Sequence, residues 1–253
     1  SQSGYIKRTP LSEYRAQARG GKGRKGAGLK EEDVITDVFA STNHQSILMF
    51  TDHGRVFVKP TYEIPSGGPT SRGKALVNVL ELQPGEKVLR LLPVRQFESG
   101  RYVFMATRSG IVKKTDLMAF ANIRATGIIA IAVDEGDLLI EARLTDGKQD
   151  VLLGTRDGQA IRFPEEQVRP MGRVSRGVKG ITLREGDQVV AMETIPQESG
   201  EQVMLTVCER GFGKCTPLHE YPTKNRGGLG VITIKTSERN GKVVDLRIVA
   251  PTD

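Results

Sequence analysis

Hydrophobic residues occur along this chain in short runs, and a glycine-centred turn follows four of these runs. After each turn comes a second run, rich in apolar and β-branched residues, that carries a cation. Glycine after Asp, Ser or His between two such runs indicates a β-hairpin, because tight hairpin turns require positive φ. The predicted hairpins join 47–50 to 55–59, 103–106 to 111–114, 151–153 to 159–163, and 203–206 to 212–215, around Gly54, Gly110, Gly158 and Gly211.

Two more elements follow each hairpin in a fixed order, so the chain consists of repeats 48–56 residues long. A second glycine site with nearby cations lies 16–19 residues beyond each turn glycine, as at 72–74 and 176–179. A third element, often acidic, then leads into another apolar strand, as at 135–139 and 185–189. A shortened first copy around Gly4 opens the chain with no strand ahead of it. By analogy with the other copies, we expect residues 34–39 to form a strand as well.

Each repeat therefore offers about four short strands, which is the size of a propeller blade. The density of glycine and of β-branched runs excludes a solenoid of helical repeats. We predict an all-β fold with radial repetition, a single domain or a fragment of one spanning 1–253. Its five units lie at roughly 1–44, 45–98, 99–147, 148–199 and 200–253.

The composition, with 38% hydrophobic and 26% charged residues, is typical of a globular protein. No apolar run approaches the length needed to cross a bilayer, and the first residues show no signal peptide. We therefore expect a fragment of a cytoplasmic protein. Two cysteines, Cys208 and Cys215, fit reduced thiols, and His44, His53 and His219 show no spacing typical of metal ligands.

The formal net charge of +7 lies entirely in the first 30 residues, which hold eight cations and one acid. Such a dense cluster of basic side chains among glycines is suited to binding a polyanion, and duplex nucleic acid is the obvious one. Charge is also sorted within each repeat, because the second glycine sites are basic and the third elements are acidic. In a radial arrangement the basic sites would form an interrupted belt, with the acids on a different side.

The heptad 17–23 resembles the seven-residue box, Gln-Arg-Arg-Gly-Gly-Lys/Arg-Gly, of the C-terminal domain of the DNA gyrase A subunit. Residues 4–7, 10–14, 103–107, 110–114 and 220–224 also look like parts of that family's blades, and the resemblance covers all 253 residues. Ala18 departs from the box, where the family usually has arginine. That departure leaves open a relative, the C-terminal domain of the topoisomerase IV A subunit. The matching positions are Gln17, Arg19, Gly20, Gly21, Lys22 and Gly23.

The resemblance implies a β-pinwheel, which is a propeller-like disc whose four-stranded blades exchange strands and whose basic rim wraps duplex DNA. The wrap lets the gyrase holoenzyme introduce negative supercoils. The family's domain commonly has six blades, so with five units we expect a disc that does not close or that closes with fewer blades. Besides the box, the predicted DNA-binding rim consists of Lys7, Arg8, Arg15, Arg24, Lys25, Lys59, Arg72, Lys74, Lys113, Lys114, Arg162, Arg173, Arg176, Lys179, Lys214, Lys224 and Arg226.

The resemblance also implies the partners and the chemistry. The expected partners are duplex DNA, the gyrase B subunit, and the rest of the gyrase A subunit, with no membrane, and the isolated domain should be monomeric. We expect no cofactor and no catalytic or metal-binding residue in this domain. ATP and Mg²⁺ are implied only for the holoenzyme, an ATP-dependent type II topoisomerase.

Alternative functions find less support in the sequence. Residues 20–26 do not meet the P-loop pattern, because lysine does not follow Gly26 where the pattern needs it. All five tyrosines are expected to serve packing rather than DNA cleavage. The competing function is a propeller scaffold that docks protein partners, with the basic segment bound to an acidic protein surface.

Overall fold

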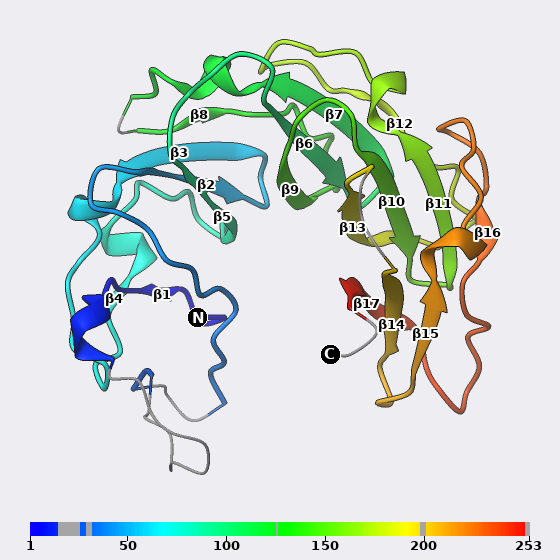
Figure 1. Cartoon of the computed structure of the whole chain (residues 1–253), viewed down its shortest axis with the longest axis horizontal. Helices are drawn as coiled ribbons and strands as arrows, with labels where there is room; N and C mark the ends of the chain where they lie inside the picture. The colour runs from blue at the N-terminus through cyan, green and yellow to red at the C-terminus, as the bar shows by residue number, and fades with distance from the viewer. Residues whose placement is uncertain (15–25, 29–31, 125, 198–200, 251–253) are drawn as a thin grey trace. The chain divides into compact units, whose positions relative to one another are not determined.

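The structure is a computed structural model, and it describes residues 1–14, 26–28, 32–124, 126–197 and 201–250. The predicted box 17–23 lies outside these ranges, as do Arg15, Arg24 and Lys25. Within the described part, strands and short 3-10 helices occur but no α-helix (Figure 1). Internal contacts divide the chain into two compact units. Unit 1 comprises residues 1–51, 55–96 and 123–128, and unit 2 comprises 52–54, 97–122 and 129–253.

Unit 1 contains a two-stranded and a four-stranded antiparallel sheet. The first pairs β1 (Tyr5–Ile6) with β4 (Lys74–Ala75). The second has the order β5-β2-β3-β8, formed by β2 (Ser46–Thr51), β3 (Arg55–Pro60), β5 (Val88–Val94) and β8 (Ile128–Ile129). Single 3-10 turns lie between strands, at η1 (Leu11–Glu13), η2 (Thr61–Glu63) and η3 (Leu76–Asn78).

Unit 2 contains three sheets. Their orders are β12-β7-β6-β9, β13-β10-β11-β16 and β15-β14-β17. The strands are β6 (Tyr102–Thr107), β7 (Ile111–Asp116), β9 (Leu139–Thr145), β10 (Asp150–Thr155), β11 (Gln159–Pro164), β12 (Val178–Lys179), β13 (Val189–Ile195), β14 (Val203–Cys208), β15 (Gly213–Pro217), β16 (Val231–Ile232) and β17 (Val243–Val249). The 3-10 turns are η4 (Leu117–Phe120), η5 (Glu165–Gln167) and η6 (Leu218–Glu220).

Neighbouring repeats exchange strands. Three strands of each four-stranded sheet come from one repeat. The fourth is a short strand from the second glycine site of the next repeat, and it pairs with the second strand, as β12 does with β7 and β16 with β11. The predicted hairpins are all present, and their turn glycines have positive φ of 76° to 87°. Exchanged strands in successive four-stranded sheets are the defining feature of a β-pinwheel, so the predicted fold is confirmed. The division into five repeat units remains a prediction.

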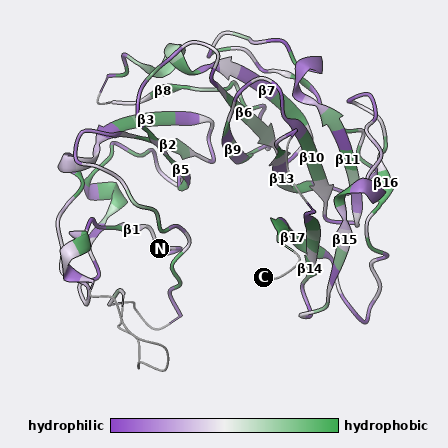
Figure 2. Ribbon diagram, viewed as in Figure 1, coloured by the Kyte–Doolittle hydropathy of each residue, from purple (hydrophilic) through white to green (hydrophobic). Residues whose placement is uncertain are grey.

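The first strand of each hairpin lies between two others in its sheet. β2, β6 and β10 are buried on both faces, whereas buried and half-buried residues alternate along β14. In unit 2, Phe104 of β6 and Val151 of β10 are fully buried and share one core cluster with Phe163 of β11. In unit 1, Met49 and Phe57 pack with residues of the 3-10 turns. Figure 2 shows hydrophobic colour along β10 and β14 and hydrophilic colour in many loops. The sheets supply the core, and the loops between them are left to carry charge.

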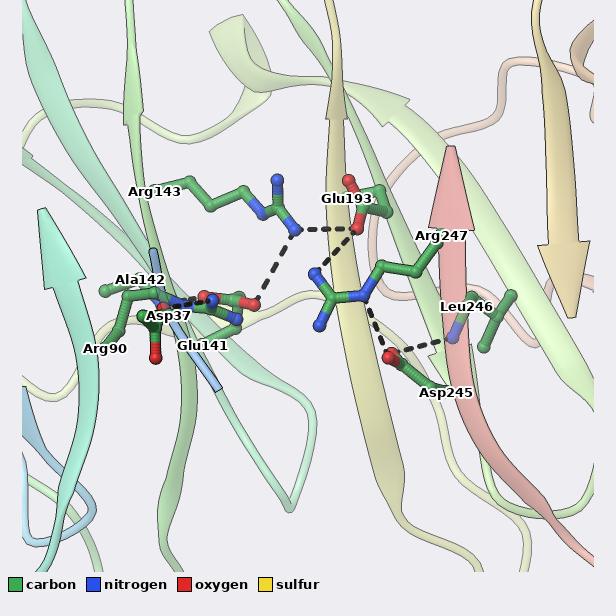
Figure 3. Close-up of polar contacts among 9 residues, drawn as sticks. All are labelled: Asp37, Arg90, Glu141, Ala142, Arg143, Glu193, Asp245, Leu246 and Arg247. Atoms are coloured by element: carbon green, nitrogen blue, oxygen red, sulfur yellow. Dashed lines mark hydrogen bonds and ion pairs between the residues drawn. The ribbon is translucent and has the colours of Figure 1, made fainter. Parts of the chain in front are cut away.

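Charged side chains connect the third strands of the three sheets in unit 2. Glu193 of β13 is 5% exposed and lies between two arginines (Figure 3). Arg143 of β9 approaches its Oε1 at 2.6 Å, and Arg247 of β17 approaches the same oxygen at 3.6 Å. Asp245 accepts from Arg247 Nε at 2.8 Å. The Glu193 carboxylate therefore links the third strands of three consecutive repeats.

The strand expected at 34–39 is not formed, and this prediction was wrong. Gln2 N donates to Val34 O, as Arg108 N donates to Leu138 O in a later repeat, which sets the register of the segment. In that register Val38 corresponds to Ala142, yet Val38 is 85% exposed while Ala142 is fully buried. The reason lies in the sheet: β9 pairs with β6, whereas no described strand occupies the corresponding place beside 34–39.

Candidate nucleic-acid interface

The second glycine sites form loops that lie against the second strand of the preceding repeat. Gly177 has φ of 101°, and a Cβ there would stand 2.5 Å from Val112 O. Gly73 has φ of 89°, and its Cβ would stand 2.3 Å from Ile6 O. Only glycine permits both the positive φ and this close approach. The loop is thereby fixed to the sheet just before its short exchanged strand begins.

The two loops share a hexapeptide, Gly-x-x-Ser-Arg-Gly, at 68–73 in unit 1 and 172–177 in unit 2. In each, the serine N–H and hydroxyl both donate to the carbonyl of the first glycine. The distances are 3.0 and 2.9 Å for Ser71 to Gly68, and 3.2 and 2.7 Å for Ser175 to Gly172. This closed turn places Arg72 and Arg176 at equivalent positions, and both are exposed. Sequence reasoning missed the serines, although the repeated Ser-Arg-Gly triplet was a visible signal.

Three predicted rim cations are held in ion pairs at the protein surface. Lys59 Nζ lies 3.1 Å from Glu63 Oε2, and Arg162 Nε lies 2.7 Å from Asp150 Oδ2. Arg176 Nε and Nη2 lie 2.5–2.9 Å from the carboxylate oxygens of Asp134. These hydrogen bonds lower the pKa of Asp134 and raise the pKa of Arg176. The last pair joins a basic loop to an acidic third element, so basic and acidic sites are not separated at this point.

Other predicted cations bind backbone carbonyls, and no carboxylate of the described residues pairs with them. Arg8 Nε donates to Ile64 O at 2.9 Å, and Arg226 Nη1 donates to Lys179 O at 2.9 Å. Lys224 Nζ is 3.4 Å from Gly230 O. Lys7 Nζ donates to Gly68 O and Pro69 O at 2.8 and 2.7 Å, and burial lowers its pKa.

A further group has no ion pair within the described residues. Arg72 stacks over the ring of Tyr5, with its Cζ 5.4 Å from the ring centroid. In the same group, Lys74, Lys179 and Lys214 are exposed and Arg173 is half-buried. In unit 1, Lys74 pairs through its backbone with Ile6, which brings it close to Lys7 and Arg72.

Lys113 and Lys114 lie inside the protein rather than on its surface. Lys113 is fully buried and Lys114 is 4% exposed. Lys113 Nζ donates to the carbonyls of Ala130, at 2.8 Å, and Arg173. Lys114 Nζ donates to Glu165 O at 2.9 Å and lies 3.8 Å from Glu165 Oε2. Neither ammonium group faces solvent, in contrast to the exposed lysines of the same predicted set.

Gln167 of η5 was not foreseen and organises a basic cluster in unit 2. Its Oε1 accepts from Arg226 N at 2.8 Å, and its backbone carbonyl accepts from Arg226 Nε at 3.1 Å. Its Nε2 donates to Lys224 O at 3.4 Å. Arg226 in turn donates to the carbonyl of Lys179, so its guanidinium joins the backbones of two predicted rim residues from two repeats, Lys179 and Lys224, through Gln167. A neutral glutamine gives no sequence signal for such a role.

The flank of the predicted box meets a loop of unit 1. Gly28 N donates to Ser71 O at 3.2 Å, and a Cβ on Gly28 would stand 2.2 Å from Thr70 O. The segment 26–28 therefore lies against the Gly-x-x-Ser-Arg-Gly loop that carries Arg72. The box ends five residues before Gly28 in the sequence.

Other chemistry finds little support in the described part of the chain. Across residues 1–14, 26–28, 32–124, 126–197 and 201–250, no three His, Cys, Asp or Glu side chains group as metal ligands would. Cys208 is buried, Cys215 is exposed, and both are free thiols. Leu205 and not Cys208 lies opposite Cys215 in the hairpin. In the same ranges, no helix is long and apolar enough to cross a membrane.

Comparisons with known proteins agree with this architecture. The DNA gyrase A subunit of Salmonella typhimurium is 46% identical over 244 residues, covering 96% of this chain and 27% of that protein. The DNA gyrase A subunit of Haloquadratum walsbyi is 44% identical over 253 residues, covering 98% and 29%. The chain thus spans less than a third of the length of these relatives.

Two solved structures are similar over 98% of the chain. The C-terminal domain of DNA topoisomerase IV has a TM-score of 0.85 and 27% identity, with 75% of that chain covered. The DNA gyrase A C-terminal domain has a TM-score of 0.76 and 25% identity, with 80% covered. The family profile described as "DNA gyrase C-terminal domain, beta-propeller" matches residues 1–42, 45–95, 101–146, 149–196 and 204–250. The chain therefore belongs to the DNA gyrase C-terminal domain family.

Proposed function

We propose that this chain binds duplex DNA through the basic loops of its exchanged strands and through the box at 17–23, and that it wraps the duplex. The observation that carries the proposal is the state of the loop cations. Arg72, Lys74, Lys179 and Arg226 keep their charge without a carboxylate partner within the described residues. In both units they lie on the glycine-site loops or on the short exchanged strands that follow these loops.

Phosphate contacts account for the expected binding properties. Because the contacts involve the DNA backbone rather than base edges, affinity should depend little on sequence and fall steeply with salt. Bending a site of 20 to 30 base pairs costs on the order of 1 to 6 kcal/mol, so several phosphate contacts must act together. With 5% aromatic residues and no tryptophan, stacking on single strands is a poor alternative.

The longer protein would supply the remaining parts of the reaction. The curated relatives are A subunits of DNA gyrase, which supports a non-catalytic domain of a cytoplasmic gyrase. This domain would work with the gyrase B subunit, and with the rest of its own A subunit. ATP and Mg²⁺ would then act in the holoenzyme and not in this domain. The identity of 44–46% to these relatives favours gyrase over the topoisomerase IV alternative.

The test is the topology of DNA bound by this chain. A nicked plasmid is incubated with increasing protein, sealed with ligase and deproteinised, and its linking number is read on a gel. Chiral wrapping predicts a shift in one direction that grows with protein and disappears at high salt. Binding without a shift would contradict wrapping. Absence of binding at low salt would contradict DNA binding and favour the protein-docking scaffold.

A further inference from the structure

One position in the repeat alternates between lysine and an apolar residue. Three residues after the turn glycine, the five copies carry Lys7, Phe57, Lys113, Ile161 and Lys214. This residue lies on the second strand or directly after it, and in the first four copies it lies against the glycine-site loop of the next repeat. Because the position is buried in Phe57, Lys113 and Ile161, an ammonium group there requires a structural reason.

Both lysines whose neighbouring loop is described make the same contact. Lys7 Nζ donates to Pro69 O at 2.7 Å, and Lys113 Nζ donates to Arg173 O. Pro69 and Arg173 each lie 15 residues after the turn glycine of the next repeat. Each ammonium has a second carbonyl, Gly68 O for Lys7 and Ala130 O for Lys113. No carboxylate of the described residues pairs with either, so both charges remain uncompensated.

The loops that meet a lysine differ in sequence from those that meet an apolar residue. Lys7 and Lys113 hold the two Gly-x-x-Ser-Arg-Gly loops, at 68–73 and 172–177. Phe57 instead lies against Gly127, whose Cβ would stand 2.7 Å from the ring, in a loop that reads Asn-Ile-Arg-Ala-Thr-Gly. Ile161 lies against Gly228, in the loop Asn-Arg-Gly-Gly-Leu-Gly. Lysine and the Ser-Arg-Gly triplet therefore occur together.

The contact has a consequence for the outer side of the loop. A trans peptide directs its C=O and the following N–H to opposite sides. Because the carbonyls of Pro69 and Arg173 point to a lysine, the N–H groups of Thr70 and Val174 point away from it. Both residues are exposed, and within the described part of the chain neither N–H donates to a protein acceptor. Each loop thus directs an N–H away from the ammonium, two residues before an exposed arginine, and outward N–H groups of this kind suit anions.

We propose that Lys7 and Lys113 are positioning residues for DNA binding, which hold each Gly-x-x-Ser-Arg-Gly loop in the form that offers its outward N–H and its arginine to one phosphate. This inference rests on the proposed DNA-binding function. In this arrangement each ammonium binds loop carbonyls rather than DNA. It orders the loop carbonyls and adds an uncompensated positive charge beneath the arginine.

Lys113→Met tests the inference, since methionine fills similar space without the ammonium. Affinity for a labelled duplex is measured over a salt series for this variant, for Arg176→Ala and for the double variant. Lys148→Met is the matched control, because Lys148 is an exposed lysine outside the predicted rim. We expect Lys113→Met to weaken binding about tenfold, well beyond the control. In the Arg176→Ala background the same change should have a much smaller effect, because both residues act through one loop.

Several results would overturn the inference. A folded Lys113→Met protein that binds DNA like the Lys148→Met control would show that the loop does not depend on the lysine. Additive effects of Lys113→Met and Arg176→Ala would show that the lysine acts only through its charge. If Lys113→Met does not fold, the same cycle is made with Lys7→Met and Arg72→Ala, because Lys7 is only half-buried. Failure of the unmodified protein to bind duplex DNA would instead refute the proposed function.

Discussion

Glu193 is a buried carboxyl group whose titration makes the stability of the protein depend on pH. Burial raises its pKa to about 7, although Arg143 and Arg247 oppose the shift. A folded-state pKa above the unfolded value means that the folded protein binds the proton more tightly. Its contribution is therefore fully present below about pH 4.5 and is lost as the pH rises through 7. At about 1.4 kcal/mol per tenfold change, the loss approaches about 3 kcal/mol.

Replacing this glutamate should remove that pH dependence. We expect the unfolding free energy of the unmodified protein, relative to Glu193→Gln, to fall between about pH 4.5 and pH 7. Urea unfolding of both proteins over this range measures the difference. Parallel stability profiles for the two proteins would contradict the prediction. Glu63→Gln is a suitable control, because Glu63 is exposed and belongs to a surface pair with Lys59.

Asp134 limits what Arg176 can offer to a phosphate. The two side chains are both about half exposed, and a surface ion pair of this kind contributes little to stability because water screens it. Asp134→Asn releases the arginine and removes a negative charge beside it. Duplex DNA affinity should therefore rise about two- to fivefold at low salt. Asp146→Asn removes the same charge at a site with no cation partner in the described residues. Equal gains from the two variants would argue against a role for the released Arg176.

At the scale of elements, the hairpins could be predicted because alternating apolar runs and a turn glycine are local signals. The exchanged strands could not, since two residues such as Val178–Lys179 carry no pattern of their own. The error at 34–39 has the same origin, because a third strand forms only where a first strand is beside it. Burial of Lys113 was likewise invisible, since its partners are carbonyls of loops 17 and 60 residues away.

Gly177 fixes a loop element to its sheet, which makes it the point to perturb. Alanine there must adopt φ near 101° with its Cβ 2.5 Å from Val112 O. We expect Gly177→Ala to destabilise the protein by about 2 kcal/mol or more, since the positive φ alone costs roughly 1–2 kcal/mol. Gly172 of the same loop has open space around its Cβ position and no positive φ. Thermal unfolding should show little change for Gly172→Ala, and a similar loss in both variants would contradict this explanation.

For the whole molecule, the net charge is concentrated in one part of the chain, whereas the repeats extend along all of it. The repeats from residue 31 onward are formally neutral, and their cations act through placement on fixed loops. The first 30 residues hold the net charge of +7, including the box. The family and its fold could be predicted from the sequence because the repeats and the box are linear patterns. Which rim cations keep their charge depends on the carboxylates that the fold places beside them, as Asp134 of one repeat lies beside Arg176 of the next, and no local pattern in the sequence indicates these pairs.

This division of charge predicts unequal contributions to wrapping. Arg19→Ala with Lys22→Ala removes two cations from the basic segment, and Arg162→Ala with Arg173→Ala removes two from the neutral repeats. Arg162 is already compensated by Asp150 at 2.7 Å, so its charge contributes less to phosphate binding than an unpaired one. The linking-number shift of a sealed nicked plasmid should therefore fall more with the first pair of substitutions. Circular dichroism establishes that both variants fold. Equal losses of the shift would mean that the box has no special part in wrapping and that any two cations serve alike.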